Sequence, residues 1–447
     1  MKYVPILDKN YKPAVLELRQ FQQDVLASKK ANKIAICLLR NNGYVYRFDM
    51  DVYQDGVNDE RNFFIVERVI KSMLWVVGGY MIYQDKGLRD FDYHFMSGVY
   101  EHDFEVEEAT FDTLPAVKES SVPAGGHLEG NRIGFDAGGS DRKVSAVVDG
   151  KTIYSEEVVW FPKTNEDPKY HYDGIYTAMK TAAEKMGNKI DAIGVSSAGA
   201  YIDNKIMVAS LFVKVPKDLF EKHVKYMYID IAKQLEKEVG HPIPLEVAND
   251  GDVTALAGAM ELKDTNVLGI AMGTSEAAGY VDSNGNLTGW LNELAFVPVD
   301  FNKDAMVDEW SLDYGCGVKY FSQDSVIKLA PAANIELDPS LSPAEKLKVV
   351  QKLSEQDDPR AHQIYETIGV YLGYAIAYYS VFYSIKHILL LGRVTSGKGG
   401  NIILKKAKEV LENEFPEYAS IHLTMPDETN RRVGQSIAAA SLPKIDK

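Results

Sequence analysis

Residues 133–140 read Ile-Gly-Phe-Asp-Ala-Gly-Gly-Ser, a short apolar strand that runs into a carboxylate and a glycine-rich turn. Glycines let the backbone approach a phosphate closely, so that free N–H groups can point at its oxygens. A carboxylate at a strand end can hold Mg²⁺, directly or through water. Asp136, Gly138, Gly139 and Ser140 are therefore candidate phosphate and magnesium residues, although a tight hairpin turn with a surface Asp would explain the same letters.

A second strand and turn have the same form. Residues 267–272 are expected to be a strand, and they run into the turn Gly273-Thr274-Ser275. On its own, a turn of this kind is more often structural than functional. Two such turns, each after a strand that opens one half of an α/β region, would clamp a polyphosphate from both sides if they faced each other.

Between the two turns, the apolar run 245–247 delivers Asn249 and Asp250 to the end of a strand. In open α/β sheets, ligands bind outside the carboxyl ends of the strands. A carboxylate at that place can accept the proton of an attacking hydroxyl, as a base does in phosphoryl transfer. Helix capping is the structural alternative, and Asp252 fits the N-cap of a helix expected over residues 254–261. Asn249 and Asp250 are therefore the candidates for chemistry.

Two later segments place polar groups beside apolar runs. Residues 289–296 read GWLNELAF, and a buried Glu293 would need a partner. Two sugar hydroxyls or a structural salt bridge would each supply one.

The apolar run 388–391 ends at Gly392 and Arg393, before an expected helix. A strand, a glycine loop and a helix in this order can contact a phosphate or a nucleoside at the helix N-terminus.

The chain from about residue 131 alternates strands and helices, and this region has two halves. Each half opens with a strand, a glycine-containing turn and a second strand, which suggests a duplicated α/β core. Further elements expected there are strands over residues 143–149, 152–160 and 192–197 and helices over residues 173–186 and 221–239.

Residues 1–130 have a different character. Two β-rich runs within residues 33–51 are joined by Asn41-Asn42-Gly43, a strong hairpin signal. Residues 120–131 are rich in turn formers and are the candidate linker. The segments expected between them are a helix over 60–74, a strand over 75–83 and an acidic, solvated loop or sheet edge over 101–108. These boundaries divide the chain into an accessory domain (1–130), a first lobe (131–262) and a second lobe (263–447).

Composition argues against several classes of function. The 447 residues carry 49 Lys and Arg against 64 Asp and Glu, and this net charge of -15 repels phosphate backbones and anionic lipid. Two cysteines are too few for a disulfide scaffold or a thiolate-only zinc site. Residues 367–385 are uncharged, but their tyrosines favour a buried helix over a membrane span. The first residues contain no apolar signal core, so we expect a cytoplasmic protein without nucleic-acid or membrane partners.

Taken in order, these motifs resemble the ROK family of sugar kinases, within the superfamily of actin, Hsp70 and hexokinase. The resemblance covers about residues 131–442. The segments that carry it are a phosphate loop at 136–140, a counterpart of the family's Asn-Asp-Ala-Asn at 249–252, a second phosphate loop at 273–275, a counterpart of Gly-Glu-Ile-Gly-His at 292–296 and an adenosine-side loop at 391–394.

The resemblance implies an α/β fold of duplicated ribonuclease H-like, actin-like ATPase lobes with a mixed sheet and flanking helices, beside a β-rich α+β accessory domain. It implies ATP and Mg²⁺ as cofactors, a small-molecule sugar substrate and a homodimer. Asp250 would be the catalytic base, and Asp136 would hold the Mg²⁺, directly or through water. The residues implied at the ATP are Asp136, Gly138, Gly139, Ser140, Gly273, Thr274, Ser275, Gly392 and Arg393, and those implied at the sugar are Asn249, Glu293 and Gly199.

The sequence departs from the family pattern near the sugar. Phe296 replaces the family's His, which contacts the sugar and often ligates a structural zinc. Cys316 alone remains of a downstream cysteine cluster, so we expect no zinc site.

It also departs from the pattern near the phosphates. Ser140-Asp141 replaces Thr-Lys, which removes a cation, and Ser275-Glu276 replaces Gly-Ile, which brings a negative charge close to the phosphates. Arg393 replaces a glycine, and its side chain could stack on the base or obstruct it.

Three functions fit these observations, and fold analogy alone does not separate them. The leading one is ATP-dependent phosphorylation of a hydroxyl on a sugar or sugar derivative, with Asp250 as the base. The second is a non-catalytic sugar or nucleotide sensor with the accessory domain as its output; Phe296 and Glu276 favour it, and the retained Asp250 argues against it. The third is a sugar-independent ATPase of the same superfamily, with water as the acceptor.

Overall fold

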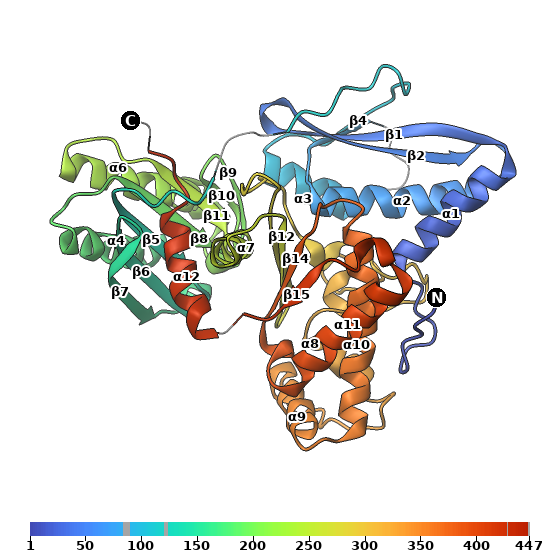
Figure 1. Ribbon diagram of the computed structural model, residues 1–447. Helices are drawn as coiled ribbons and strands as arrows, with labels where there is room; N and C mark the ends of the chain where they lie inside the picture. Colours follow the sequence, from blue (N-terminus) through green and yellow to red (C-terminus); the bar gives the residue numbers. More distant parts are fainter. Residues whose placement is uncertain (84–89, 120–123, 427, 446–447) are drawn as a thin grey trace.

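The computed structural model describes residues 1–83, 90–119, 124–426 and 428–445, and three sheets organise it (Figure 1). The sheet of the first lobe has five strands in the order β11-β8-β5-β6-β7. Its strands are β5 (Asn131–Ala137), β6 (Asp141–Val148), β7 (Lys151–Val159), β8 (Ala192–Ser197) and β11 (Leu245–Asn249). β5, β6 and β7 pair antiparallel, whereas β5, β8 and β11 run parallel, so their carboxyl ends meet at one edge.

Helices cover the faces of this sheet, and a small hairpin extends from it. Its helices and hairpin strands are α4 (Pro168–Lys185), α5 (Lys217–Leu219), α6 (Met227–Val239), β9 (Ala200–Ile202) and β10 (Lys205–Val208). The helix expected from residue 221 begins later, because residues 220–224 form a single π-helical turn before α6.

The second lobe repeats this plan with one strand fewer. Its sheet has the order β13-β12-β14-β15, with β12 antiparallel to β13 and parallel to β14. Its strands and helices are β12 (Val267–Met272), β13 (Glu276–Val281), β14 (His387–Leu391), β15 (His422–Thr424), α8 (Gln323–Leu329), α9 (Pro343–Glu355), α10 (Pro359–Tyr379) and α11 (Lys398–Glu414). Both lobes therefore open with a hairpin and add parallel strands, which confirms the duplicated α/β core with mixed sheets.

Glycines let α10 and α11 pack closely. A Cβ at Gly369 would lie 2.6 Å from the Cβ of Lys406, and one at Gly373 would lie 2.6 Å from the Cβ of Val410. The tyrosines of α10 are buried in the lobe, as expected for residues 367–385. No helix in the described ranges is both long and apolar enough to cross a membrane.

Two helices connect the lobes. α7 (Asp250–Leu262) leads from β11 into the second lobe, and α12 (Glu428–Ala440) returns from the second lobe to the sheet of the first (Figure 1). The contact between α12 and β8 is close, because a Cβ at Gly194 would lie 1.7 Å from the carbonyl oxygen of Ala439. The C-terminal helix therefore packs on the first lobe although it follows the second in sequence.

The N-terminal unit has a four-stranded sheet in the order β2-β1-β3-β4. Its elements are α1 (Ala14–Ser28), β1 (Ala31–Arg40), β2 (Tyr44–Tyr53), α2 (Asp59–Val76), β3 (Met81–Tyr83), α3 (Asp90–Tyr100) and β4 (Glu105–Glu107). The hairpin through Asn41-Asn42-Gly43 is confirmed, with positive φ at Asn42 and Gly43. The strand expected over 75–83 is wrong in its first half, because α2 continues to Val76.

This unit is mixed α+β rather than β-rich, because its three helices contain more residues than its four strands. β4, in the acidic stretch, is an exposed sheet edge, as expected. Part of the candidate linker, residues 120–123, lies outside the described residues. The part that follows contacts the C-terminal segment, since Gly125 N donates to Leu442 O and His127 N donates to Ser441 O.

The accessory unit and the second lobe share one hydrophobic core. Trp75 of α2 is buried and packs against Phe296 of the second lobe, with ring centroids 4.8 Å apart. Beside it, the buried side chains of Arg68 and Lys71 both form ion pairs with Asp313. The two units therefore form a continuous packed body.

Candidate functional site

Asp136 lies at the carboxyl end of β5, next to the parallel strand β8. Its Oδ1 accepts a hydrogen bond of 2.8 Å from Ser196 Oγ, the residue in register on β8. The net pKa of Asp136 is raised to about 6, mainly by burial. The negative charge of Asp250 contributes to the rise, and the hydrogen bond from Ser196 opposes it. Asp136 is thus part of a site crowded with carboxylates.

Asp250 is the first residue of α7, immediately after β11. Asn249 is the N-cap: its Oδ1 accepts from Gly251 N at 2.8 Å, so the assignment of the cap to Asp252 was wrong. Burial raises the pKa of Asp250, while hydrogen bonds from the Gly251 and Asp250 backbone and the charge of Lys163 lower it. A carboxylate with a raised pKa is a stronger base than an exposed one.

Glu293 completes this group from the second lobe. Its net pKa is raised to about 7, mainly by burial and also by the charge of Asp250. Its backbone N–H donates to the carbonyl of Trp75 at 3.0 Å, so the accessory helix α2 fixes its position. The fold therefore brings Asp136, Asp250 and Glu293, which are far apart in sequence, within electrostatic reach of one another.

The turn Gly138-Gly139-Ser140 connects β5 to β6, and Trp160 holds its shape. Trp160 Nε1 donates to Gly138 O at 2.7 Å, and Trp160 N donates to Ser140 O at 3.1 Å. Gly138 must be a glycine, because a Cβ there would lie 2.7 Å from Asp141 O. Gly139 and Ser140 are exposed, so their backbone groups are accessible to a ligand.

Lys163 is a residue that the sequence analysis missed. It lies in a 3-10 turn, Pro162–Thr164, and its ammonium nitrogen would be 3.1 Å from a Cβ at Gly139. The buried ring of His171 holds the turn, with its nitrogens 3.0 Å from Pro162 O and 3.1 Å from Asp167 O. A lone Lys in a polar loop gives no sequence signal of this placement. Lys163 thus places a positive charge beside the phosphate loop, which lacks the family's lysine because Ser140-Asp141 stands in place of Thr-Lys.

The second turn and the Gly392 loop lie together at the edge of the other sheet. Thr274 and Ser275 are exposed, and Gly273 N donates to Ser275 O at 2.9 Å. Gly392 has φ +94°, and a Cβ there would lie 2.3 Å from Met272 O. Arg393 follows and is exposed. The structure therefore brings these two expected ATP-binding loops together.

Glu276 does not place a charge at the phosphate turn, contrary to the expectation. Its side chain is buried, and a Cβ at Gly317 would lie 2.4 Å from its Oε2. Burial raises the pKa of Glu276 well above its usual value, and neither carboxylate oxygen has a hydrogen-bond partner among the described residues. Such burial favours the neutral carboxylic acid over the carboxylate, because the charged form is poorly solvated.

The two remaining residues expected at the sugar, Asn249 and Gly199, contact each other. Asn249 Nδ2 donates to Gly199 O at 2.8 Å. Gly199 has φ +138°, and a Cβ there would lie 2.2 Å from Val208 O. Both residues also line a cavity beside α7.

Phe296 and Cys316, the two departures near the sugar, are packed in apolar surroundings. Phe296 contacts Trp75 and Trp310, with ring centroids 4.8 and 4.6 Å apart. Cys316 is fully buried, and burial raises its thiol pKa to about 12. Within the described ranges there is no group of three or more His, Cys, Asp or Glu residues that could hold a metal ion. Aromatic packing thus occupies the surroundings of Phe296.

Asp136 nevertheless fits a Mg²⁺ ion that arrives with a nucleotide. Mg²⁺ is commonly bound through one or two carboxylates together with substrate phosphates and water, and needs no cage of protein ligands. Burial is the main cause of the raised pKa of Asp136, and the charge of the nearby Asp250 adds to it, so a divalent cation at this place would be favoured by both carboxylates.

Comparisons with known proteins agree with this geometry. The model of the ROK family matches residues 132–438. The fold is similar to that of a ROK hexokinase from Thermus thermophilus, with 18% identity, 69% of this chain and 97% of that chain covered, and a TM-score of 0.52. It is also similar to a ROK family transcriptional regulator, a homologue of the E. coli Mlc protein, with 15% identity, 70% and 79% coverage and a TM-score of 0.51. No curated protein matches the sequence significantly. The family match covers more than half of the chain, which therefore belongs to the ROK family.

Proposed function

We propose that the protein transfers the γ-phosphate of ATP to a hydroxyl of a sugar or sugar derivative. The observation that carries this proposal is the half-buried Asp250 at the start of α7, with its raised pKa and with Lys163 and Glu293 close enough to interact electrostatically. A purely structural N-terminal residue of a helix would not need two further carboxylates, Asp136 and Glu293, near it, because their mutual repulsion is unfavourable.

In the proposed reaction, Asp250 accepts the proton of the sugar hydroxyl as that oxygen attacks the γ-phosphorus. The new O–P bond forms while the bond from the γ-phosphorus to the bridging oxygen breaks, and ADP leaves with the electron pair. Glu293 accepts hydrogen bonds from neighbouring hydroxyls and orients the sugar. Positioning and charge stabilisation supply most of the acceleration in reactions of this class.

The two glycine turns bind the phosphates in this proposal. Backbone N–H groups of Gly138-Gly139-Ser140 and of Gly273-Thr274-Ser275 donate to phosphate oxygens, and Gly392 and Arg393 flank the adenosine. Mg²⁺, held by Asp136, would neutralise charge on the β- and γ-phosphates. Lys163 places a second positive charge over the first turn, where it can contact the γ-phosphate.

Coupled measurement of ADP release tests the proposal. Wild-type protein and Asp250→Asn would be assayed with Mg-ATP and a panel of hexoses, amino sugars and N-acetyl sugars. Sugar-dependent release that the substitution reduces by several orders of magnitude supports the kinase. Equal release with and without sugar supports the ATPase, and no release from either protein with any sugar contradicts both.

A non-catalytic sensor remains the second candidate, and Phe296 favours it. A phenyl ring in a packed aromatic cluster cannot donate a hydrogen bond to a sugar, as the family's His does. A sensor would bind sugar without turnover, so sugar would raise the Tm of wild type and of Asp250→Asn alike while no ADP is released.

A further inference from the structure

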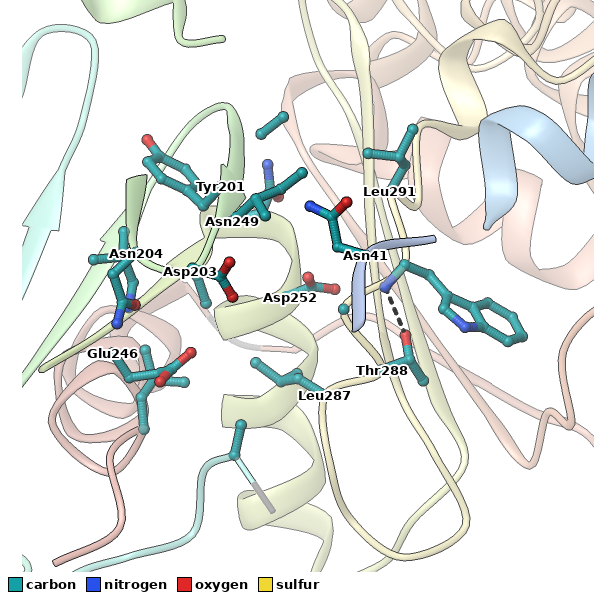
Figure 2. A pocket seen from close by; sticks show the side chains of 18 of the residues that line it. Asn41, Tyr201, Asp203, Asn204, Glu246, Asn249, Asp252, Leu287, Thr288 and Leu291 are labelled. Atoms are coloured by element: carbon teal, nitrogen blue, oxygen red, sulfur yellow. Dashed lines mark hydrogen bonds between the residues drawn. The ribbon is translucent and has the colours of Figure 1, made fainter. Parts of the chain in front are cut away.

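A cavity of about 490 Å³ lies where the two lobes and the accessory unit meet (Figure 2). Its size falls within the range of about 300–1,000 Å³ that is usual for small-molecule sites. The first lobe contributes the β9–β10 turn and β11, the second lobe contributes residues 287–291, and the accessory unit contributes the β1–β2 turn. The accessory unit therefore supplies part of the cavity wall.

Acidic side chains form one wall of the cavity. Asp203 and Glu246 turn their carboxylates toward its middle, with Asp252 on the opposite side (Figure 2). The pKa of Glu246 is raised to about 7, mainly by burial and also by the charge of Asp203. Within the described ranges neither Asp203 nor Glu246 forms an ion pair. Asp203 is exposed and Glu246 is half-buried, so both carboxylates are accessible acceptors for the donors of a ligand.

The accessory wall has an unused donor. The Arg40 side chain is 4% exposed, and its Nη2 pairs with Glu119. Its Nε is buried and has no hydrogen-bond partner among the described residues. Glu119 also accepts from Trp290 Nε1 at 3.3 Å, which ties the second-lobe wall to the accessory unit. A buried donor without an acceptor is costly, and the Arg40 side chain lines the cavity beside this unpaired group.

Aromatic and amide side chains complete the lining. Tyr44, Tyr201 and Trp290 line the cavity, and so does Asn41 of the β1–β2 turn. The flat faces of such rings pack against the C–H groups of a sugar ring, while carboxylates and amides bind its hydroxyls. Lys444 at the rim is the other basic residue that faces the cavity. Taken together, the lining fits a ligand with many hydroxyl donors.

The cavity adjoins the proposed transfer site, although Asp136, Asp250 and Glu293 are not among the residues that line it. Asn249 lines it, and the next residue is Asp250, whose Cα lies only about 3.8 Å further along the chain. Gly199, which contacts Asn249, lines it as well. A ligand held at Asp250 could therefore extend past Asn249 into the cavity.

We propose that the cavity is a second sugar subsite, so that the substrate is a disaccharide or longer glycoside with its reacting unit at Asp250 and its next unit between Glu246, Asp203 and the β1–β2 turn. This inference rests on the proposed function for the place of the first unit. The second unit donates hydroxyls to Glu246 and Asp203 and accepts from Arg40.

Calorimetric titration tests the subsite without turnover. The Asp250→Asn protein would be titrated with each monosaccharide that shifts its Tm and with disaccharides in which that sugar carries a second unit, either neutral or amine-bearing. We expect the best disaccharide to bind at least tenfold more tightly than the monosaccharide, which corresponds to about 1.4 kcal/mol. Tighter binding of the amine-bearing disaccharides would indicate that Asp203 and Glu246 bind an ammonium group of the second unit. Tighter binding of the neutral disaccharides would indicate that they bind its hydroxyl groups.

Glu246→Gln, added to the same protein, removes the charge with little change in shape. It should lower the ratio of disaccharide to monosaccharide affinity about tenfold, and Asp203→Asn should act in the same direction. Glu107→Gln on the exposed strand β4 is the matched control and should leave the ratio unchanged. Equal affinities for the two sugars, or equal ratios in Glu246→Gln and Glu107→Gln, would overturn the subsite.

The failure of each proposal has its own signature. A disaccharide preference that depends on Glu246, without ADP release by the wild type, rejects the kinase and retains the subsite as part of a sensor. Monosaccharide phosphorylation with no effect of the second unit retains the kinase and rejects the subsite. Simultaneous binding of a monosaccharide and a disaccharide also rejects it, because the two must compete for the place at Asp250.

Discussion

Lys163 lies over the backbone of Gly139, so that a Cβ at Gly139 would come within 2.9 Å of its Cε and 3.1 Å of its Nζ. The two residues belong to different turns of the first lobe, and a glycine is needed for the lysine to approach so closely. The same ammonium group lowers the pKa of Asp250. Lys163 therefore links the expected phosphate turn to the proposed base.

Lys163→Met should reduce kcat about 10²- to 10³-fold, the usual loss when one group that stabilises transition-state charge is removed. The KM for ATP should change less, because the turn backbone still binds the ground state. Lys169→Met is the control, since Lys169 is an exposed lysine of the same segment that pairs with Asp173. Steady-state kinetics of both variants decide the matter, and equal activities would remove Lys163 from the site.

Strand-and-turn motifs could be read from the sequence, because glycine turns and strand ends have local signals. The duplicated lobes and the hairpin through Asn42 follow from such signals, whereas the meeting of Asp136, Asp250 and Glu293 was implied by the family resemblance. Lys163 could not be found in this way, because its place depends on how a distant turn packs on β5. The burial of Glu276, which was expected to place a charge near the phosphates, depends in the same way on distant packing, because its side chain lies against Gly317.

The raised pKa values of the site carboxylates predict a dependence of activity on pH. The pKa is about 6 for Asp136 and about 7 for Glu293, and that of Asp250 is also raised. The working forms are the carboxylates, so kcat/KM should fall as the pH drops from about 7.5 to 5.5 through these pKa values. A profile of kcat/KM against pH, with enzyme stability checked at each pH, tests this. Constant activity down to pH 5 would contradict it.

Asp252→Asn should stabilise the protein at neutral pH. Burial raises the pKa of Asp252 to about 7, whereas it is about 3.9 in an unfolded chain. Between these values the folded state holds a proton that the unfolded state has lost, so stability falls as the pH rises from 4 to 7. Asn cannot ionise, and its oxygen can still accept from Tyr280 N and Asn292 Nδ2.

The gain from Asp252→Asn in the free energy of unfolding should therefore grow from near zero at pH 4 to as much as about 4 kcal/mol at pH 8. Urea unfolding at several pH values measures it. Asp55→Asn, at an exposed position, is the control and should show no such trend. A gain that does not depend on pH would mean that Asp252 ionises with an ordinary pKa.

Gly392→Ala should destabilise the second lobe by more than a positive φ alone explains. Gly392 has φ +94° and would place its Cβ 2.3 Å from Met272 O, whereas Gly56 has φ +77° and nothing within 4 Å. Gly56→Ala should cost about 1 kcal/mol, the conformational cost for an L-residue. The additional loss of stability in Gly392→Ala, beyond that in Gly56→Ala, measures the cost of disturbing the contact between the Gly392 loop and β12. Thermal unfolding of both variants compares them, and equal losses would show that the loop can move away freely.

Trp75→Ala should lower the stability of the whole molecule, because the indole joins two units. Trp75 is 1% exposed, and its ring centroid lies 4.9 Å from Phe95 and 4.8 Å from Phe296. Truncating a buried Trp costs about 3–5 kcal/mol. Trp310→Ala is the matched comparison: Trp310 also contacts Phe296 but is 51% exposed, so its loss should cost less.

The shape of the unfolding curve tests more directly whether Trp75 joins the accessory unit to the second lobe. The core that contains Trp75 continues through Tyr320 and Tyr378 of the second lobe, so the accessory unit and that lobe should unfold in one transition that Trp75→Ala shifts as a whole. An early transition of the accessory unit alone, shifted by Trp75→Ala while the lobe unfolds as before, would show two separable domains. The carbonyl of Trp75 also receives the Glu293 N–H, so loss of the joint should weaken sugar binding at Glu293 before the lobes unfold.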